Sequence, residues 1–228
     1  MTDWLDWQGP LATWGVPLFL LAVALWLAAP ALERYRAERR LRRRLRRAGV
    51  GMLESVVLPD GLEGEVFIDY LLLTPRSIDV LMVQRYRGAI FAAEGMDNWS
   101  QVVGARTWRF ANPLPELERN VMAVRQVAGK VPVEGHLVVS GEARFPKGRP
   151  AAVRGIETFA PAGGEAVPTS LRQAWQALRQ AARPLDRQER RLWQESSRPA
   201  DGVRDGLLAL ILAALAVAWL IWRLEWLS

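Results

Sequence analysis

The sequence predicts an α/β fold, with a mixed β-sheet domain between two transmembrane helices. Three observations predict it: an uncharged apolar segment lies near each end of the chain, short apolar runs separated by turn residues fill the middle, and two helical patterns follow those runs. Strands followed by a helix, a strand and a helix are typical of helices packed against one sheet. The chain has 228 residues and no cysteine, which excludes disulfides and zinc–cysteine sites.

The first apolar segment covers residues 11–32 and carries no charge. About 20 apolar residues cross a bilayer as a helix, so we expect a transmembrane helix here, preceded by an extracytoplasmic N-terminus of residues 1–10. A cleaved signal peptide is the alternative. It needs a basic segment before the apolar run, whereas Asp3 and Asp6 stand there.

The second apolar segment covers residues 206–222 and is short for a membrane span. Trp219 and Trp222 lie at its end and Trp226 just after it, and tryptophans are typical anchors at the membrane interface. We therefore expect a second transmembrane helix and an extracytoplasmic C-terminus of residues 223–228. A buried helix of a soluble core is the alternative, but such a helix would need a polar face.

The arginine-rich segments predict how the chain is oriented in the membrane. Residues 33–48 are expected to form a basic juxtamembrane helix, and the polar linker of residues 184–205 is also arginine-rich. Because the cytoplasmic flanks of membrane spans are enriched in Lys and Arg, both flanks are expected to face the cytoplasm. We therefore expect the chain in the cell (inner) membrane, with both termini outside and the central domain, residues 49–183, in the cytoplasm.

The positive charge of the chain lies in the basic segment. Nine Arg against two Glu give residues 33–47 a charge of +7, while the whole chain carries +6, so all other residues together sum to −1. A near-neutral domain argues against a broad nucleic-acid-binding surface. We expect the segment Arg34–Arg47 to contact anionic lipid head groups at the membrane. Nucleic-acid binding by this segment alone is the alternative.

The central domain shows strand and helix patterns in turn. Apolar runs bounded by turn residues predict strands over residues 52–58, 66–73, 78–83, 88–93, 131–140 and 152–159. A helix is expected from Pro113 to Ala128, with Asn112 as its N-cap and Gly129 at its end. A second amphipathic helix is expected over residues 170–182.

Two acids interrupt neighbouring apolar runs of this domain. If residues 78–83 and 88–93 form a hairpin with Tyr86-Arg87 as its turn, Asp79 lies directly opposite Glu94. Opposed Cβ atoms in an antiparallel pair are about 4.5–5.5 Å apart, close enough for two carboxylates to share one divalent cation. The alternative is that both acids end their strands separately and reach water.

The order SID, GAIFAAE, DNW, Trp108 and FANP before a helix resembles the NERD (nuclease-related domain) family, a branch of the restriction-endonuclease-like superfamily. The usual pattern of that family is QID, a hydrophobic strand, a turn with Gly, a strand that ends E-x-K-N, a tryptophan, and NP-x-x-Q at the start of a helix. The likeness covers roughly residues 52–182.

The resemblance implies a restriction-endonuclease-like mixed-sheet domain. It implies that Asp79 and Glu94 are the catalytic, metal-binding carboxylates, with Mg²⁺ or Mn²⁺ as the cofactor. It also implies a structural motif made of Trp108, Asn112 and Pro113.

The chain departs from the family pattern at the residue that matters most for hydrolysis. The lysine position holds Met96, which can neither stabilise charge at a phosphate nor orient a water. Asp97 replaces the asparagine, Ser77 the first glutamine, and Glu116 the glutamine of the helix. The resemblance therefore implies a vestigial catalytic pair.

We accordingly expect a catalytically degenerate membrane protein, a pseudoenzyme that acts as a binding or scaffolding module at the cytoplasmic face. One alternative is an active metal-dependent nuclease in which Arg106 or Arg109 replaces the lysine. Another is a domain that contacts only a protein partner. His136 is the only histidine, which excludes a multi-histidine metal site, and it lies in an apolar run, so we expect it to pack in the core or at the surface.

Overall fold

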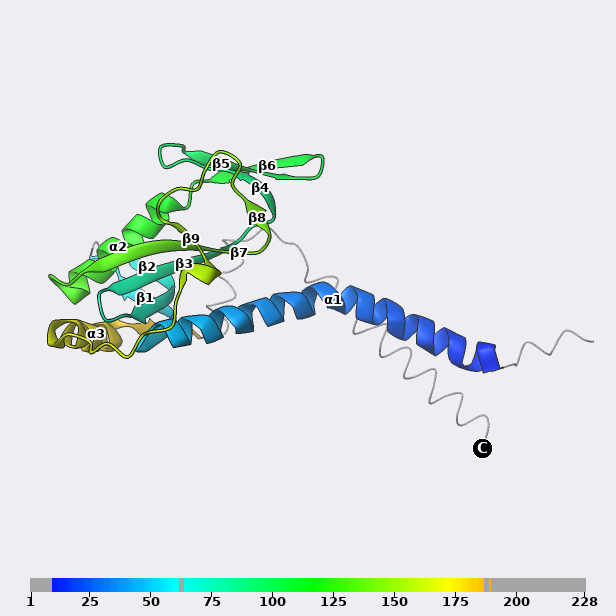
Figure 1. Ribbon diagram of the computed structural model, residues 1–228, viewed down its shortest axis with the longest axis horizontal. Helices are drawn as coiled ribbons and strands as arrows, with labels where there is room; N and C mark the ends of the chain where they lie inside the picture. The colour runs from blue at the N-terminus through cyan, green and yellow to red at the C-terminus, as the bar shows by residue number, and fades with distance from the viewer. Residues whose placement is uncertain (1–9, 62–63, 187–188, 190–228) are drawn as a thin grey trace, which may run out of the picture. The chain divides into compact units, whose positions relative to one another are not determined.

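The computed structural model describes residues 10–61, 64–186 and 189 (Figure 1). The chain divides into two compact units, Met1–Arg39 with Ser197–Ser228, and Arg40–Ser196. In the first unit the structure describes the N-terminal part of α1 (Pro10–Ala48), which exposes several large apolar side chains. Trp26, for example, is 75% exposed.

Within the part of the chain that the structure describes, no helix offers an apolar stretch long enough to cross a membrane. The second predicted span, residues 206–222, lies outside the described residues, as do the side chains of residues 10–17 at the start of the first. Membrane anchoring therefore stays a prediction.

The second unit is built on a mixed sheet, which confirms the predicted α/β class. β1 (Gly51–Pro59), β2 (Glu65–Leu73) and β3 (Ile78–Arg85) form an antiparallel meander, and β7 (Val133–Ser140) lies parallel to β3. The short strands β9 (Val153–Gly155) and β10 (Arg183–Pro184) complete the order β10-β1-β2-β3-β7-β9. The central strands carry apolar residues on both faces because both faces are covered.

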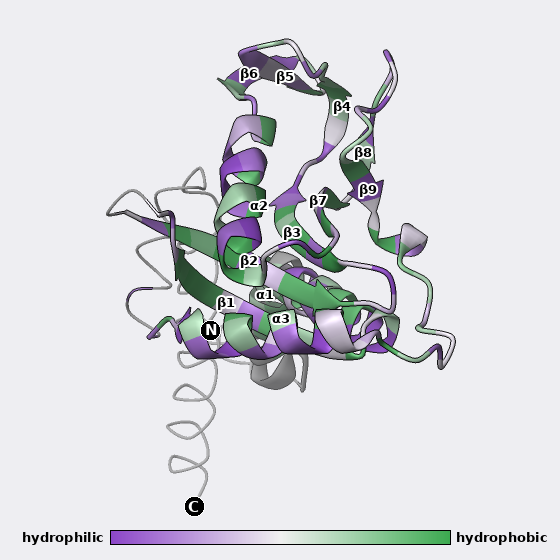
Figure 2. Cartoon of the chain, turned by 90° about the vertical axis from the view of Figure 1, so that its left-hand side faces the viewer, coloured by the Kyte–Doolittle hydropathy of each residue, from purple (hydrophilic) through white to green (hydrophobic). Residues whose placement is uncertain are grey.

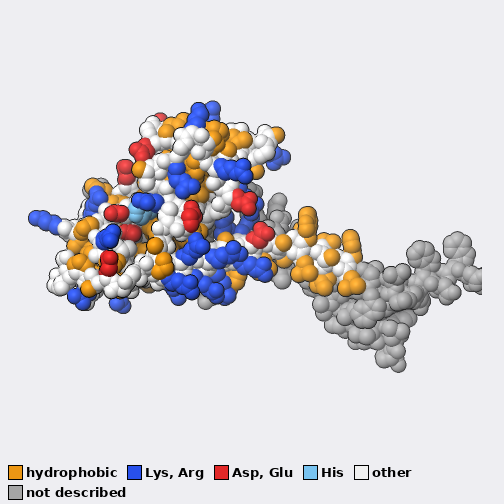
Figure 3. All heavy atoms as spheres, viewed as in Figure 1, with side chains coloured by type: hydrophobic (Ala, Val, Ile, Leu, Met, Phe, Trp, Pro, Cys, Tyr) orange, Lys and Arg blue, Asp and Glu red, His pale blue; other side chains and the backbone are white. Residues whose placement is uncertain are grey.

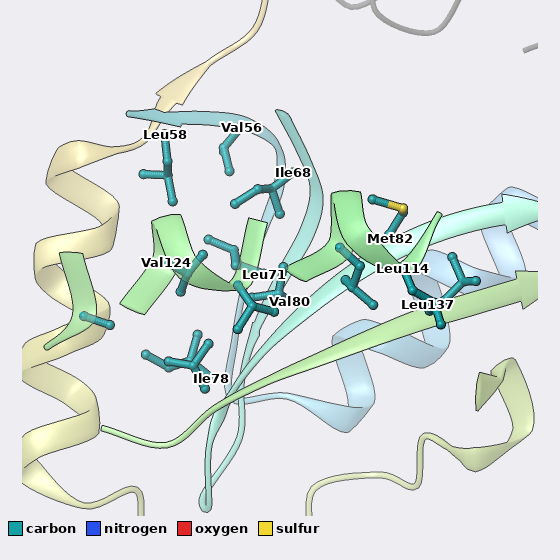
Figure 4. Close-up of a cluster of buried hydrophobic side chains, with 14 of the residues drawn as sticks. Val56, Leu58, Ile68, Leu71, Ile78, Val80, Met82, Leu114, Val124 and Leu137 are labelled. Carbon is teal, nitrogen blue, oxygen red and sulfur yellow. The ribbon is translucent and has the colours of Figure 1, made fainter. Parts of the chain in front are cut away.

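One face of this sheet packs against α2 (Leu114–Ala128) and α3 (Thr169–Ala181). Their apolar residues recur every three or four positions and meet the inward side chains of the strands. Figure 4 shows this core, with Met82 beside Leu114 and Leu137. Gly135 permits the close approach of α2, because a Cβ there would lie 2.6 Å from Val121.

The other face is covered by the C-terminal turns of α1. Leu41 and Leu45 are buried there against Tyr70, Leu72 and Leu81. Fully burying a leucine stabilises a fold by about 1.5–3 kcal/mol, whereas an exposed ion pair contributes about 0–1 kcal/mol. Apolar packing, more than the ion pairs of nearby arginines with Glu54, therefore holds this end of α1 on the sheet.

A second, smaller sheet has the strand order β6-β5-β4-β8 (Figure 2). It consists of β4 (Gly88–Phe91), β5 (Asn98–Val103), β6 (Arg106–Ala111) and β8 (Ala143–Arg144). β5 and β6 form an antiparallel hairpin that the sequence reasoning missed, because their polar and aromatic residues resemble a loop. A 3₁₀ turn over Ile156–Thr158 follows β9.

The predicted hairpin between residues 78–83 and 88–93 is wrong. β3 pairs with β2 and β7, while β4 pairs with β5 and β8, in the other sheet. The pairs Arg85–Ser140 and Gly88–Ala143 show that the chain continues in the same direction past Tyr86. Tyr86 is buried, and its ring centroid lies 5.1 Å from that of Phe110, so it belongs to the core and not to an exposed turn.

α2 starts one residue later than predicted, and the Asn112 side chain still accepts a hydrogen bond from an amide at the helix start. α2 begins at Leu114, with Pro113 before it. The Asn112 side chain accepts a hydrogen bond from the Leu114 amide at 3.0 Å and donates to the carbonyls of Glu94 and Met96. Asn112 therefore joins the start of α2 to the loop after β4. Gly129 ends the helix with a φ of 74°.

Candidate functional site

Asp79 is held rigidly near the start of β3. Its carboxylate is buried, and Ser77 Oγ donates a hydrogen bond to Asp79 Oδ1 at 2.5 Å. Ser77 is in turn tied to Thr74, whose hydroxyl accepts the Ser77 amide at 3.0 Å. The tight turn between β2 and β3 thus orients the carboxylate of Asp79.

The parallel pairing of β3 with β7 brings two further polar side chains to Asp79. Asp79 is the register partner of Glu134, and Leu81 is the partner of His136. Because alternate residues of a strand share a face, Asp79, Glu134 and His136 lie on the same face of the sheet. One ligating atom from each of these residues lies within 4.8 Å of the others.

Burial sets the protonation of this cluster. It raises the pKa of Asp79 above its ordinary value, and the hydrogen bond from Ser77 and the charge of His136 oppose that rise only in part. Burial also lowers the pKa of His136, although the charge of Asp79 raises it. His136 Nε2 lies 3.5 Å from Glu134 Oε2, whose side chain is 60% exposed. The cluster therefore has a buried end at Asp79 and a solvent-facing end at Glu134.

A cavity of about 350 Å³ adjoins the cluster, and Asp79 lies in its wall. The turn between β2 and β3 lines one side, through Thr74 and Arg76. The segment after the 3₁₀ turn lines the other, and its Phe159 ring also packs edge-on against His136. The cavity is large enough for several water molecules beside the carboxylate.

Glu94 does not join Asp79. It follows β4 in the smaller sheet, is exposed, and accepts a hydrogen bond from the Ala151 amide at 3.1 Å. Asp79 lies near the start of β3, and the six residues from there to Arg85, at the end of the strand, alone rise about 20 Å. The predicted metal-binding pair is therefore not assembled.

The remaining predicted residues also lie at the smaller sheet. Met96 is 48% exposed in the loop after β4. Arg106, Trp108 and Arg109 are exposed on β6, and Gln101 is the register partner of Trp108. In this arrangement the two arginines lie on a strand of the other sheet and do not take the place of a lysine beside Asp79.

The antiparallel hairpin of the large sheet carries a different carboxylate, Asp69 on β2. Its Oδ2 accepts a hydrogen bond from the Val83 amide of β3 at 2.8 Å. The register that pairs Tyr70 with Leu81 ends just before Asp69 and Met82. The backbone of the neighbouring strand β1 is irregular opposite Asp69. Ser55 lies there between the pairs Glu54–Tyr70 and Val56–Ile68, and its φ of 51° is the only positive value at a non-glycine residue in the described ranges.

Sequence reasoning missed Asp69, Glu134 and the proximity of His136 to Asp79. A signal for Asp69 was present, because Ile68-Asp69 repeats the Ile-Asp pair that ends at Asp79. Glu134 and His136 are two positions apart, which places them on one face of a strand. Only the parallel pairing of β7 with β3, which has no local signature, brings them to Asp79.

Comparison with known proteins gives one match. The family model described as NERD, nuclease-related domain, matches residues 33–140. No curated protein and no solved structure matches the chain. The matched residues run from the basic part of α1 through β7 and include Asp69, Asp79 and Glu134. A nuclease-related domain is therefore present in this chain, which supports its resemblance to the NERD family.

Proposed function

We propose that this chain is a membrane-anchored nuclease-related protein that no longer hydrolyses nucleic acid and serves as a binding or scaffolding module at the cytoplasmic face. One observation supports the proposed loss of catalysis. The strand paired with Asp69 offers neither a carboxylate nor a lysine where the family pattern requires both.

The NERD pattern has its Asp on one strand and E-x-K-N on the strand that follows. β2 and β3 are consecutive and antiparallel, joined by the turn after Leu73. Ile68-Asp69 then takes the place of the family's Ile-Asp, and β3 offers Met82-Val83-Gln84-Arg85 in place of E-x-K-N. In this alignment Met82 replaces the glutamate and Gln84 replaces the lysine.

The surroundings of these residues support a structural role. Met82 is 5% exposed and packs in the core between the sheet and α2 (Figure 4). The Asp69 carboxylate accepts a backbone N–H at the point where β2 and β3 diverge. A neutral amide at Gln84 cannot supply the positive charge that stabilises a phosphoryl transition state.

The nuclease cofactor implied by the family, Mg²⁺ or Mn²⁺, does not fit this hairpin. A hard divalent cation takes several oxygen ligands, with carboxylates foremost. Asp69 contributes one carboxylate, and Met82 contributes a thioether in the core. The hairpin therefore lacks the oxygen ligands that a hydrolytic Mg²⁺ or Mn²⁺ would need.

Two features of α1 support the membrane part of the proposal. Leu18, Phe19, Leu25 and Trp26 are each more than half exposed, and such apolar side chains favour contact with lipid or another apolar partner. Figure 3 shows basic side chains gathered along the arginine-rich part of α1. Anionic head groups would bind these arginines beside an apolar anchor.

A cleavage assay tests the catalytic part. Full-length protein in detergent is incubated with plasmid and single-stranded DNA and RNA in Mg²⁺ or Mn²⁺, beside the variants Asp69→Asn, Asp79→Asn and Glu94→Gln. We expect no cleavage above the buffer control from any of them. Cleavage by the wild-type chain that any one of these substitutions abolishes would overturn the proposal and identify the catalytic carboxylate.

Flotation of the full-length protein with liposomes tests the membrane part. Neutral vesicles probe the apolar anchor, and vesicles with anionic lipid probe the arginines. We expect the protein to float with both kinds of vesicle, and a variant with Arg36, Arg43 and Arg44 changed to Gln to lose the preference for anionic lipid. Wild-type protein that stays in the bottom fraction with both kinds of vesicle would refute anchoring.

A further inference from the structure

We propose that Asp79, Glu134 and His136 form a binding site for a first-row transition-metal dication such as Zn²⁺. This site is separate from the Asp69 hairpin discussed above and from the predicted Asp79–Glu94 pair. It does not depend on whether the protein cleaves nucleic acid.

The three side chains are close enough to bind one ion. The three candidate ligand atoms lie within 4.8 Å of one another, on adjacent parallel strands near the centre of the sheet. Ligands about 2.0–2.2 Å from one ion lie about 3–4.4 Å apart, so small side-chain rotations bring all three to a common ion. Because β3 and β7 are central strands, the backbone positions of the ligands are firmly held.

Two of these side chains also keep atoms that could bind an ion and that accept or donate no protein hydrogen bond among the described residues. Within the described residues, the hydrogen bond from Ser77 reaches only Oδ1 of Asp79, and Oδ2 accepts none. The His136 side chain is only 12% exposed, and its Nε2 lies 3.5 Å from Glu134 Oε2, too long for a good hydrogen bond. Because Asp79 lines the cavity and Glu134 is exposed, a water or an ion can reach these atoms.

Neighbouring residues hold the side chains of Asp79 and His136 in place. Metal-binding side chains are commonly fixed by a second set of hydrogen bonds and packing contacts. Ser77 and Thr74 orient the Asp79 carboxylate, and the Phe159 ring packs edge-on against the imidazole of His136. The Glu134 side chain is exposed, so an ion can reach the site from solvent on that side.

The donor set indicates the class of metal. Imidazole suits Zn²⁺, Cu²⁺, Fe²⁺ and Ni²⁺, whereas an all-oxygen set suits Mg²⁺ and Ca²⁺. One imidazole and two carboxylates neutralise a dication and leave at least one coordination position open, as in catalytic zinc sites. Asp79 also lines the cavity, so water from that side can fill an open position.

The positive charge of Arg154 opposes the ion. Arg154 on β9 is close enough to act electrostatically on both Asp79 and His136. It is exposed, so solvent screens it, and the two carboxylates outweigh it. The arrangement therefore predicts that removing this arginine charge tightens metal binding.

The test uses the tag-free, full-length chain in detergent after removal of metal with a chelator. Calorimetry with Zn²⁺ and visible absorption with Co²⁺ report affinity, stoichiometry and coordination. We expect one equivalent to bind with a Co²⁺ spectrum, and Asp79→Asn, Glu134→Gln and His136→Gln to weaken binding at least about tenfold, in line with the loss seen for even outer-sphere changes. Arg154→Gln should strengthen binding.

Glu94→Gln is the matched control, because it removes an exposed carboxylate that sequence reasoning assigned to the metal. Its affinity should equal that of the wild-type chain. Glu134→Gln keeps the test decisive if the buried variants fold poorly, since this side chain is exposed. The proposal is overturned if the folded wild-type chain shows no saturable binding of Zn²⁺ or Co²⁺, or if Glu134→Gln binds as wild type does.

Discussion

Replacing Tyr86-Arg87 by Asn-Gly distinguishes directly between the hairpin that the sequence suggests and the continuous strand that the structure has. Asn-Gly is the preferred pair for a two-residue hairpin turn. If the chain turned here, the double substitution would be neutral or stabilising. In the structure the same substitution removes a core side chain and is strongly destabilising.

The expected magnitude follows from the packing of Tyr86. The residue is 8% exposed, belongs to the main core, and contacts Phe110 ring to ring. Truncating a buried aromatic residue costs about 3–5 kcal/mol, and a buried amide without a partner adds about 1–3 kcal/mol. Since total stability is about 5–15 kcal/mol, Tyr86→Asn should lower the free energy of unfolding by at least about 3 kcal/mol.

Urea denaturation of the full-length protein, followed by circular dichroism, measures this change. Arg87→Gly is the control, because Arg87 is exposed and the change should cost about 1 kcal/mol or less. Tyr86→Leu gives a milder version should Tyr86→Asn fail to fold. The continuous β3–β4 strand would be refuted if the Asn-Gly variant were as stable as wild type or more stable.

Three further predictions concern packing, capping and pH. Leu45→Ala should lower the free energy of unfolding by about 2–5 kcal/mol, because Leu45 is fully buried against the sheet; a urea titration showing less than about 0.5 kcal/mol, as for a surface position, would contradict the docking of α1. Asn112→Ala should cost about 1–2 kcal/mol, since it removes both the cap of α2 and the link to the Glu94 loop; a wild-type melting temperature would argue against this link. Burial raises the pKa of Tyr86 well above its ordinary 10, so the neutral phenol is favoured in the fold, and stability should be complete below about pH 10 and fall as the pH rises above it. Tyr86→Phe should show a weaker fall in melting temperature over the alkaline range, and an unchanged fall would assign the effect to another group.

Local sequence patterns predicted the elements well where the periodicity was strong. The amphipathic spacing of residues 114–128 and the flanking Asn112 and Gly129 located α2 within one residue, because a helix and its caps depend on neighbouring residues. The strands of the large sheet followed from their apolar runs. β5 and β6 were missed because their residues satisfy no clear alternation of polar and apolar side chains.

The candidate site was predicted only in part. Asp79 was singled out as an unusual acid within an apolar strand, and the structure places it in a buried position. Its partner was assigned by assuming that consecutive strands form a hairpin. Tyr86 is instead part of the main core. The chain continues past it into β4 of the smaller sheet, so Glu94 lies away from Asp79.

By itself the sequence determined the mixed α/β class, the bounds of α2 to within one residue, and the charge of the basic segment. These depend on composition and on short-range spacing. The tertiary structure alone decided that Asp79 lies beside Glu134 and His136, and that Asp69 lies in the β2–β3 hairpin. Strand pairing between distant segments is selected by burial of both sheet faces, and no short stretch of sequence contains that choice.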